Sequence, residues 1–362
     1  MNTDIEDLIR MQIAFGAGST KAYEVFNKIN NGEFINPKLL NKVDEVHPQY
    51  VFQVRSICNK NNIEIIPITA EWYPASLRQL TNPPLILYAK GRIPNFNLLP
   101  SVSIVGPRKV SEFGEKSAYA LGRRLAKAGL IVVSGGALGC DTAAHKGALS
   151  VKGSTVAVMG CGLNYNYLPQ NNPLREEIIK YGCLISEYLP NEPTSKYSFP
   201  VRNRIISGLS KAVILPEAPY KSGALITAKY AVEQGKDVFV IPGNPTLECY
   251  KGSNELLRDG AMPLLNAGDV LSVYLSQYSE YLDLNNAFDD DVETQKENND
   301  KKTNISLSNE AEMLYNNIVK EKFSADDFES LGISDDEILS ALTELEMLSL
   351  IKSLPGGLYK RV

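Results

Sequence analysis

The stretch SIVGPRKVSEFG, residues 103–114, has the layout of a nucleotide-binding fold, with an apolar strand, a glycine turn and then a helix. A dinucleotide site would have G-x-G-x-x-G in this turn, whereas this chain has Pro107, Arg108 and Lys109 there. The acidic residue that would bind a ribose hydroxyl and the P-loop signature G-x-x-x-x-G-K-[ST] are also missing. The positively charged turn is therefore expected to bind a different anion, one with a longer phosphate chain.

Strand-like and helical patterns alternate from residue 61 to residue 284, with short loops between them. Several strand-like runs are apolar on successive residues, which is typical of strands buried on both faces of a parallel sheet. The alternation predicts an α/β fold with an extended Rossmann-like, doubly wound and mostly parallel sheet. The expected strands are Glu64–Ile66, Leu85–Tyr88, Ser101–Val105, Leu130–Val133, Thr155–Met159, Cys183–Ile185, Ala212–Leu215 and Val238–Ile241.

Three further segments flank this Rossmann-like domain. Residues 1–60 have apolar residues at helical spacing and predict a small helical domain. Residues 285–304 are polar, charged and aperiodic, which predicts a flexible acidic linker. Residues 305–362 combine helical patterns, a capping box at Ser334-x-x-Glu337 and a final hairpin pattern, and these predict a winged-helix domain.

The N-terminal domain contains the glycine turn FGAGSTK at residues 15–21. One interpretation is a helix-hairpin-helix, whose turn presents backbone N–H groups to a DNA phosphate. The other is an ordinary helical hairpin in which the glycines only cap the helices. We prefer the ordinary hairpin, because one short turn is little evidence for a binding motif.

The net charge of −5 at pH 7 is distributed unevenly along the 362 residues. Residues 305–362 hold 5 Lys and Arg against 11 Asp and Glu, and residues 285–304 hold 3 against 6. Residues 1–284 hold 29 against 25. A polyanion is therefore expected to bind in this basic first part of the chain.

The composition also excludes several classes of protein. Five scattered cysteines without a C-x-x-C pair, and only two histidines, argue against disulfides and zinc sites. No apolar run reaches the roughly 18 residues of a membrane span, and the acidic N-terminus lacks the features of a signal peptide. We therefore expect a cytoplasmic protein without a metal site or membrane attachment.

Four loops at predicted strand ends combine small residues with a helix start. In chain order they are Gly106–Lys109, Ser134–Gly139, Phe199–Arg204 and Tyr220–Thr227. Small residues let an anion approach the backbone, and the N–H groups of a helix start favour negative charge. Three of the loops add Arg or Lys, which bond phosphate oxygens. All four lie on one edge of the expected sheet, so together they predict a phosphate-binding face. Its expected members are Gly106, Arg108, Lys109, Ser134, Gly135, Gly139, Arg202, Asn203, Arg204, Lys221, Ser222 and Gly223.

Two of these residues, Arg202 and Arg204, stand at a helix start where the helix dipole disfavours a cation. Their partner is either an anionic ligand or a buried carboxylate, and we prefer the ligand. Asp141 is expected to be the N-cap or first-turn acid of its helix. His145, one helical turn later, is expected to be a hydrogen-bonded structural histidine, because no nucleophile or metal set accompanies it.

Three aromatic residues lie on loops after strands: Tyr165, Tyr167 and Phe199. Proteins that bind single strands stack bases on such rings, at roughly 1–3 kcal/mol per base. Loop aromatics also pack into the core. Both roles stay open for these three side chains.

The loop sequences resemble the DNA-processing protein A family, also called DprA or Smf, from about Trp72 to Gly268. Pro107, Gly136, Leu138 and Cys140 depart from the family pattern, and the lack of a basic residue at 138 would remove one phosphate contact. The matching motifs are Gly106-x-Arg108-Lys109-x-Ser111-x-x-Gly114, Ser134-Gly135-x-Ala137-x-Gly139-x-Asp141-x-x-Ala144-His145-x-x-Ala148-Leu149, Phe199-Pro200-x-Arg202-Asn203-Arg204-Ile205-Ile206-x-Gly208-Leu209-Ser210, Lys221-Ser222-Gly223-x-Leu225-Ile226-Thr227-Ala228 and Ile241-Pro242-Gly243-Asn244.

The resemblance implies a bacterial cytosolic protein that binds single-stranded DNA through its Rossmann-like domain. Such proteins protect incoming strands during natural transformation and load the RecA recombinase onto them. The resemblance also implies a homodimer. We expect no cofactor, no metal, no catalytic residue and no enzymatic activity.

An alternative function belongs to another class. Phosphoribohydrolases of the lysine-decarboxylase-like group have a similar Rossmann variant and cleave nucleoside monophosphates. They resemble P-G-G-x-G-T-x-x-E at the fourth loop, where the chemistry needs the Glu. In this chain the loop from Lys221 to Ala228 has no Glu after Thr227, which argues against hydrolysis.

Overall fold

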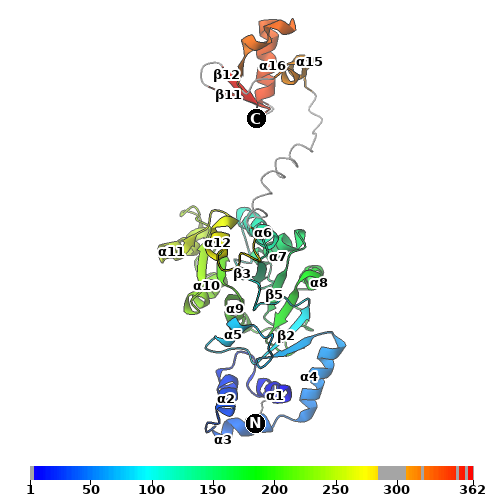
Figure 1. The fold of residues 1–362 in the computed structure, drawn as a ribbon, viewed down its shortest axis with the longest axis vertical. Helices are drawn as coiled ribbons and strands as arrows, with labels where there is room; N and C mark the ends of the chain where they lie inside the picture. Colours follow the sequence, from blue (N-terminus) through cyan, green and yellow to red (C-terminus); the bar gives the residue numbers. More distant parts are fainter. Residues whose placement is uncertain (1–3, 284–306, 319–321, 348–349, 355–357, 362) are drawn as a thin grey trace. The chain divides into compact units, whose positions relative to one another are not determined.

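The computed structural model describes residues 4–283, 307–318, 322–347, 350–354 and 358–361. The chain forms two compact units, Met1–Asp290 and Asp291–Val362 (Figure 1). The predicted linker, residues 285–304, lies outside the described residues. In the part of the chain that is described, no helix is both long enough and apolar enough to cross a membrane.

Four helices open the first unit, as the apolar spacing predicts. They pack through the buried side chains of Leu8, Ile9, Val25 and Phe26, and this apolar cluster continues into the sheet. Asp4 begins the first helix, because its carboxylate accepts the N–H groups of the first turn. The helices are α1 (Ile5–Phe15), α2 (Thr20–Asn31), α3 (Pro37–Asp44) and α4 (Pro48–Lys60).

A nine-stranded sheet runs through the described part of the first unit in the order β1-β2-β6-β5-β4-β3-β7-β8-β9. The strands from β6 to β9 in this order are parallel, whereas β1 pairs with β2 and β2 with β6 in antiparallel fashion. The predicted α/β fold with a mostly parallel sheet is thus confirmed. The strands are β1 (Glu64–Pro67), β2 (Ile86–Gly91), β3 (Ser101–Ile104), β4 (Ile131–Ser134), β5 (Thr155–Met159), β6 (Cys183–Ser186), β7 (Ala212–Leu215), β8 (Asp237–Val240) and β9 (Met262–Pro263).

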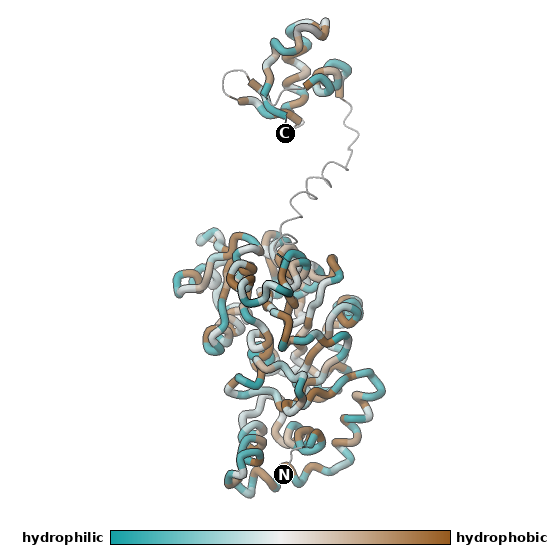
Figure 2. Tube along the Cα trace, in the orientation of Figure 1, coloured by the Kyte–Doolittle hydropathy of each residue, from teal (hydrophilic) through white to brown (hydrophobic). Residues whose placement is uncertain are grey.

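Successive side chains of a strand point to opposite faces of the sheet, and the side chains of the inner strands are buried on both faces. Val132 belongs to the apolar cluster that contains α6, α7 and α12, whereas Ile131 and Val133 belong to the cluster that contains α9 and α10. Brown segments of the trace mark these apolar stretches (Figure 2). The covering elements are α5 (Ala75–Arg78), α6 (Glu112–Lys127), α7 (Cys140–Ser150), η1 (Pro169–Asn171), α8 (Asn172–Tyr181), α9 (Ser198–Leu209), α10 (Gly223–Glu233), η2 (Glu248–Tyr250), α11 (Lys251–Arg258) and α12 (Ala267–Tyr274).

The second unit has its own core, which includes Leu314, Phe323, Phe328 and Leu342. Half of the predicted capping box is present: the Ser334 N–H and hydroxyl both donate to the Glu337 carboxylate, at 2.9 and 2.7 Å. Its three strands are antiparallel in the order β10-β12-β11. The elements are α15 (Asn309–Asn316), β10 (Phe323–Ser324), η3 (Ala325–Leu331), α16 (Asp335–Met347), β11 (Ile351–Leu354) and β12 (Leu358–Arg361).

Candidate nucleic-acid interface

Residues from all four predicted loops line one cleft of roughly 370 Å³ in the first unit. The loops after β3, β4 and β7 meet there because these strands are neighbours in the sheet, and parallel strands end at the same edge. The third predicted loop, Phe199–Arg204, is instead part of helix α9 (Ser198–Leu209), which contributes Phe199, Arg202 and Asn203 to the cleft. Six of the twelve predicted phosphate-binding residues line the cleft: Gly106, Arg108, Arg202, Asn203, Ser222 and Gly223. The other six are Lys109, Ser134, Gly135, Gly139, Arg204 and Lys221.

Exposed cations stand on the loops that form the cleft. The side chains of Arg108 and Lys109 are exposed on the turn after β3, and Lys221 is exposed just before α10. The Arg108 guanidinium lies over the ring of Phe199, 4.8 Å from its centroid, which holds this cation at the opening. Lys221 has a φ of +67°, in the left-handed region that favours glycine. These three cations are free of any described carboxylate partner within ion-pair distance and can therefore meet an external anion.

Two of the predicted stacking residues contact each other beside the cleft. The rings of Tyr167 and Phe199 lie 5.6 Å apart between centroids, at a tilt of 44°. Arg175 lies 6.0 Å from the Tyr167 centroid, so the two rings stand between two guanidinium groups. Tyr165 is 40% exposed. The half-buried pair therefore packs against the protein and also forms part of the surface, whereas Tyr165 stands out into solvent.

Arg202 lies in the floor of the cleft and is only 4% exposed. Its Nη1 donates to the carbonyl oxygen of Gly135 at 2.6 Å and to that of Val158, and thereby joins the ends of β4 and β5. Its Nε donates to the side-chain oxygen of Asn203 at 3.2 Å. Burial lowers the pKa of the Arg202 guanidinium. Much of its donor capacity is therefore used inside the protein, in a role that supports the loops.

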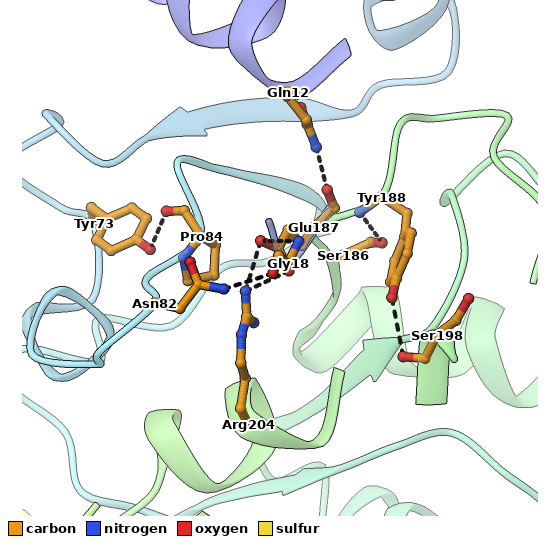
Figure 3. Close-up of polar contacts among 10 residues, drawn as sticks. All are labelled: Gln12, Gly18, Tyr73, Asn82, Pro84, Ser186, Glu187, Tyr188, Ser198 and Arg204. Atoms are coloured by element: carbon orange, nitrogen blue, oxygen red, sulfur yellow. Dashed lines mark hydrogen bonds and ion pairs between the residues drawn. The ribbon is translucent and has the colours of Figure 1, made fainter. Parts of the chain in front are cut away.

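Arg204 points away from the cleft toward the N-terminal helices. It is 7% exposed, and its Nη2 donates to both carboxylate oxygens of Glu187 at 2.8 Å. The Gly18 N–H donates to the same carboxylate at 3.0 Å, and Gln12 donates to the Glu187 carbonyl oxygen (Figure 3). The preferred interpretation of Arg204, an anionic ligand, is wrong, and its partner is the buried carboxylate.

The glycine turn at residues 15–21 is explained by the same contacts. Asn82 donates to the Gly18 carbonyl oxygen at 2.7 Å, so both backbone groups of Gly18 bond within the protein (Figure 3). Gly18 has a φ of +72°, and a Cβ there would lie 2.3 Å from the Val201 side chain. The turn is an internal contact between the helical start and α9, and its N–H meets a carboxylate instead of a phosphate.

The loop after β4 also binds a carboxylate of the chain. The N–H groups of Gly135 and Ala137 donate to Asp141 Oδ2 at 3.1 and 3.3 Å. The N-cap of α7 is Gly139, so Asp141 is a first-turn acid, and the N-cap alternative is wrong. Ser134 uses its hydroxyl to donate to the Ile104 carbonyl oxygen at 2.6 Å. Burial raises the pKa of the Asp141 carboxyl, and the charge of Arg202 opposes that rise.

Two of the glycines serve close packing of the first loop on α7. A Cβ on Gly139 would lie 2.5 and 2.6 Å from the carbonyl oxygens of Arg108 and Pro107, and Gly139 has a φ of +75°. A Cβ on Gly106 would lie 2.6 Å from the Cys140 Sγ. These glycines are therefore needed for protein contacts whether or not a ligand is bound.

His145 is a structural residue, as predicted. It is fully buried, and its Nδ1 lies 2.8 Å from the Thr155 hydroxyl, which donates to the Val132 carbonyl oxygen. Burial and the charge of Arg202 lower the pKa of His145 to about 3. The ring is therefore neutral near pH 7 and holds α7 to the sheet.

The sequence interpretation missed two buried carboxylates. Glu187 follows β6 and Glu217 follows β7, and neither is more than 5% exposed. Glu217 accepts the Ser111 N–H at 2.8 Å and the Ser111 hydroxyl at the start of α6. The available signal was their position, because each acid comes one or two residues after an apolar strand, where a buried charge requires a partner.

A model of the family described as DNA recombination-mediator protein A matches residues 64–275. The chain belongs to this family. The family model spans every predicted site residue, and the resemblance drawn from the loops is confirmed.

Individual relatives agree with the family match. Protein Smf of Synechocystis is 42% identical over 203 residues, which cover 55% of this chain and 51% of that protein. DNA processing protein DprA of Streptococcus pneumoniae is 38% identical over 235 residues, covering 64% of this chain and 79% of that protein. The matched stretch is thus about half the length of the Synechocystis relative.

Solved structures of the family have the same fold. The chain superposes on DNA processing protein A from Streptococcus pneumoniae with a TM-score of 0.66 and 32% identity, covering 75% of this chain and 98% of that one. DNA processing protein A from Helicobacter pylori, whose structure concerns its single-stranded DNA binding mode, gives 0.54 and 33%, covering 60% and 97%.

Proposed function

We propose that this chain binds single-stranded DNA through the cleft formed by its four strand-end loops. The observation that carries the proposal is the meeting of these loops at one edge of the sheet, with Arg108 exposed at the opening. Family membership and the single-stranded DNA binding of the Helicobacter pylori relative support it.

The residues have different roles in this proposal. Arg108, Lys109 and Lys221 contact phosphates, because they are exposed cations. Ser222 and Gly223 offer the start of α10 to a phosphate, since Gly223 is exposed and a Cβ added there would have no neighbour within 4 Å. Tyr165 and the exposed part of Phe199 offer rings to the bases, and base stacking does not select a sequence.

Residues Ser134, Gly135, Gly139, Arg202, Asn203 and Arg204, which the loop motifs also indicate, contribute in a different way. The side chains or backbone groups of these residues bond or pack within the protein. In the proposal the first five support or shape the cleft, and phosphate contacts fall mainly to the exposed residues. Arg204 instead pairs with the Glu187 carboxylate away from the cleft.

Oligothymidylate binding at several salt concentrations tests the proposal. If the loops neutralise about four phosphates, log K falls against log salt with a slope near −3, from about −0.7 per phosphate of a single strand. A slope near zero, or tighter binding to duplex than to single strands, contradicts the proposal. Release of free base from nucleoside monophosphates would instead support the phosphoribohydrolase alternative.

The wider assignments rest on the sequence patterns and on the family resemblance. We infer that the domains are residues 1–60, 61–284 and 305–362, joined to the last by the linker 285–304, and that the last domain is a winged helix. We infer a cytoplasmic homodimer that protects strands during natural transformation and loads RecA. Light scattering tests the dimer, and RecA filament formation on strands covered by a single-strand binding protein tests the loading.

A further inference from the structure

Three backbone turns in the first unit are built like phosphate sites, and each holds a carboxylate of the chain itself. Glu187 accepts from Gly18 in the glycine turn, Glu217 from Ser111 at the start of α6, and Asp141 from the loop that opens α7. All three acids are at least nine-tenths buried. Two of the three, Glu217 and Asp141, stand at the helix starts that follow neighbouring parallel strands.

The start of α6 is where a dinucleotide-binding fold places the pyrophosphate. Here the Glu217 carboxylate accepts the N–H and the hydroxyl of Ser111, the N-cap residue. A Cβ on Gly114, in the first turn, would lie 2.5 Å from Glu217 Oε2. The glycine thus gives the carboxylate the close approach to the helix that a glycine elsewhere gives to a phosphate.

The start of α7 repeats the arrangement on the next strand. The Asp141 carboxylate binds two N–H groups of the loop and lines the cleft. A Cβ on Gly135 would lie 2.6 Å from Asp141 Oδ2 and 2.7 Å from Arg202 Nη1, so the carboxylate and the guanidinium both pack closely against Gly135. A free phosphate at this loop would have to displace a carboxylate that already has its donors.

The start of α10 differs from both. Its first turn holds no acidic residue, and Ser222, its own N-cap, accepts the Ala224 N–H at 3.3 Å. Among the described residues, no carboxylate hydrogen-bonds to this turn, and Gly223 is exposed. An anion in the cleft therefore meets the open start of α10 and the filled start of α7, whereas the filled start of α6 is not among the residues that line the cleft.

We propose that Asp141 and Glu217 are specificity-determining residues that occupy the two nucleotide-phosphate positions of the fold and so keep free phosphate and nucleotides from binding at the starts of α7 and α6. This inference rests on the proposed function, since exclusion matters for a cleft that must select a strand in the presence of nucleotides. A DNA strand gains from many phosphates on the exposed cations and the α10 start together, whereas a single phosphate in the cleft finds only the α10 start open.

The test uses the full chain with Asp141→Ala and Glu217→Ala, and with Asp141→Asn as the matched control. Each Ala variant vacates N–H groups, and inorganic phosphate is expected to raise its melting temperature by about 3 °C or more relative to chloride at equal ionic strength. Wild type and Asp141→Asn, whose amide oxygen still accepts the same N–H groups, are expected to show no difference. Absence of phosphate rescue in both Ala variants overturns the proposal.

A second measurement needs no variant. Adenosine monophosphate at about 0.1–10 mM is expected to leave oligothymidylate binding by wild type unchanged at constant ionic strength. Specific competition by the nucleotide overturns the proposal even if the Ala variants do not fold. Failure of wild type to bind oligothymidylate contradicts the proposed function instead, and phosphate rescue of the Ala variants would still place the two carboxylates at anion positions.

Discussion

The rim of the cleft and the buried side of α9 use the same kind of residue in opposite ways. At the rim, Arg108 is exposed over an aromatic ring, and Lys109 and Lys221 are exposed beside it. On the buried side, Arg202 bonds to carbonyl oxygens and Arg204 to a carboxylate. The four-loop pattern assigned all five cations to phosphate. The difference shows that a cation near a helix start indicates an anion, but its exposure decides whether that anion is a ligand.

The physical reason is the cost of taking a charge out of water. A buried guanidinium needs a partner in the fold, because an uncompensated buried charge is strongly destabilising. An exposed guanidinium or ammonium group is stabilised by water, and it exchanges that water for phosphate oxygens when DNA binds. The two regions should therefore respond differently to mutation, the buried side in stability and the rim in affinity.

The largest effect is expected for Arg204→Ala. It removes one partner of a buried pair and leaves the Glu187 carboxylate without its main counter-charge, so the free energy of unfolding should fall by about 3–5 kcal/mol. Urea unfolding measures it. Arg55→Ala is the matched control, because Arg55 pairs with Glu6 and both side chains are 48% exposed; its loss should be about 0–1 kcal/mol. Equal losses of unfolding free energy in Arg204→Ala and Arg55→Ala would contradict the difference between buried and exposed cations.

Arg108→Ala should act on affinity alone. Loss of a charged hydrogen-bond partner should weaken oligothymidylate binding by about 1–3 kcal/mol, with an unchanged melting temperature. Fluorescence anisotropy and thermal melting measure the two quantities.

Asp141→Ala should do the reverse and lower the melting temperature more than the affinity for oligothymidylate, because the Asp141 carboxylate holds the loop before α7. Equal losses of affinity in Arg108→Ala and Asp141→Ala would show that the exposed rim and the buried loop contacts do not have separate roles in binding and stability.

His145 extends the contrast to pH. Burial lowers the pKa of His145 from 6.5 to about 3, so the folded chain keeps it neutral while the unfolded chain takes up a proton below about pH 6.5. The contribution of neutral His145 to the free energy of unfolding is therefore complete above pH 6.5 and is lost as the pH falls toward 3. The stability advantage of wild type over His145→Gln should therefore shrink by about 1 kcal/mol from pH 7 to pH 5.5.

If His145→Gln keeps the wild-type pH dependence of stability over this range, the imidazole is not held neutral by the fold.

The smallest effect is expected from removing the second unit. The helix α16 begins with exposed Asp335, Asp336 and Glu337, and the segment 305–362 holds 5 basic against 11 acidic residues. Such a surface repels a polyanion, so a chain ending at residue 284 should bind oligothymidylate at least as tightly as the full chain. A tenfold loss of affinity with an intact fold would place the acidic unit in the DNA site.

Local patterns in the sequence were sufficient for the secondary structure and for the edge of the sheet that carries the cleft. Each of the eight expected strands has a counterpart that differs by a few residues at its ends. The ninth strand, Met262–Pro263, has two residues and a proline, too little for a pattern. The antiparallel pairing of β1 and β2 was also not predicted, because strand direction depends on the path of the chain between strands.

The sequence alone determined that small residues, helix starts and cations meet at one edge, because neighbours in the chain set the alternation of buried strands and turns. Only the tertiary structure decided which cations face solvent. Glu187 lies 169 residues from Gly18 and 17 from Arg204, and Glu217 lies 106 from Ser111. The partner of a buried charge is set by the order of strands in the sheet, and residues that far apart in sequence carry no local record of their contact.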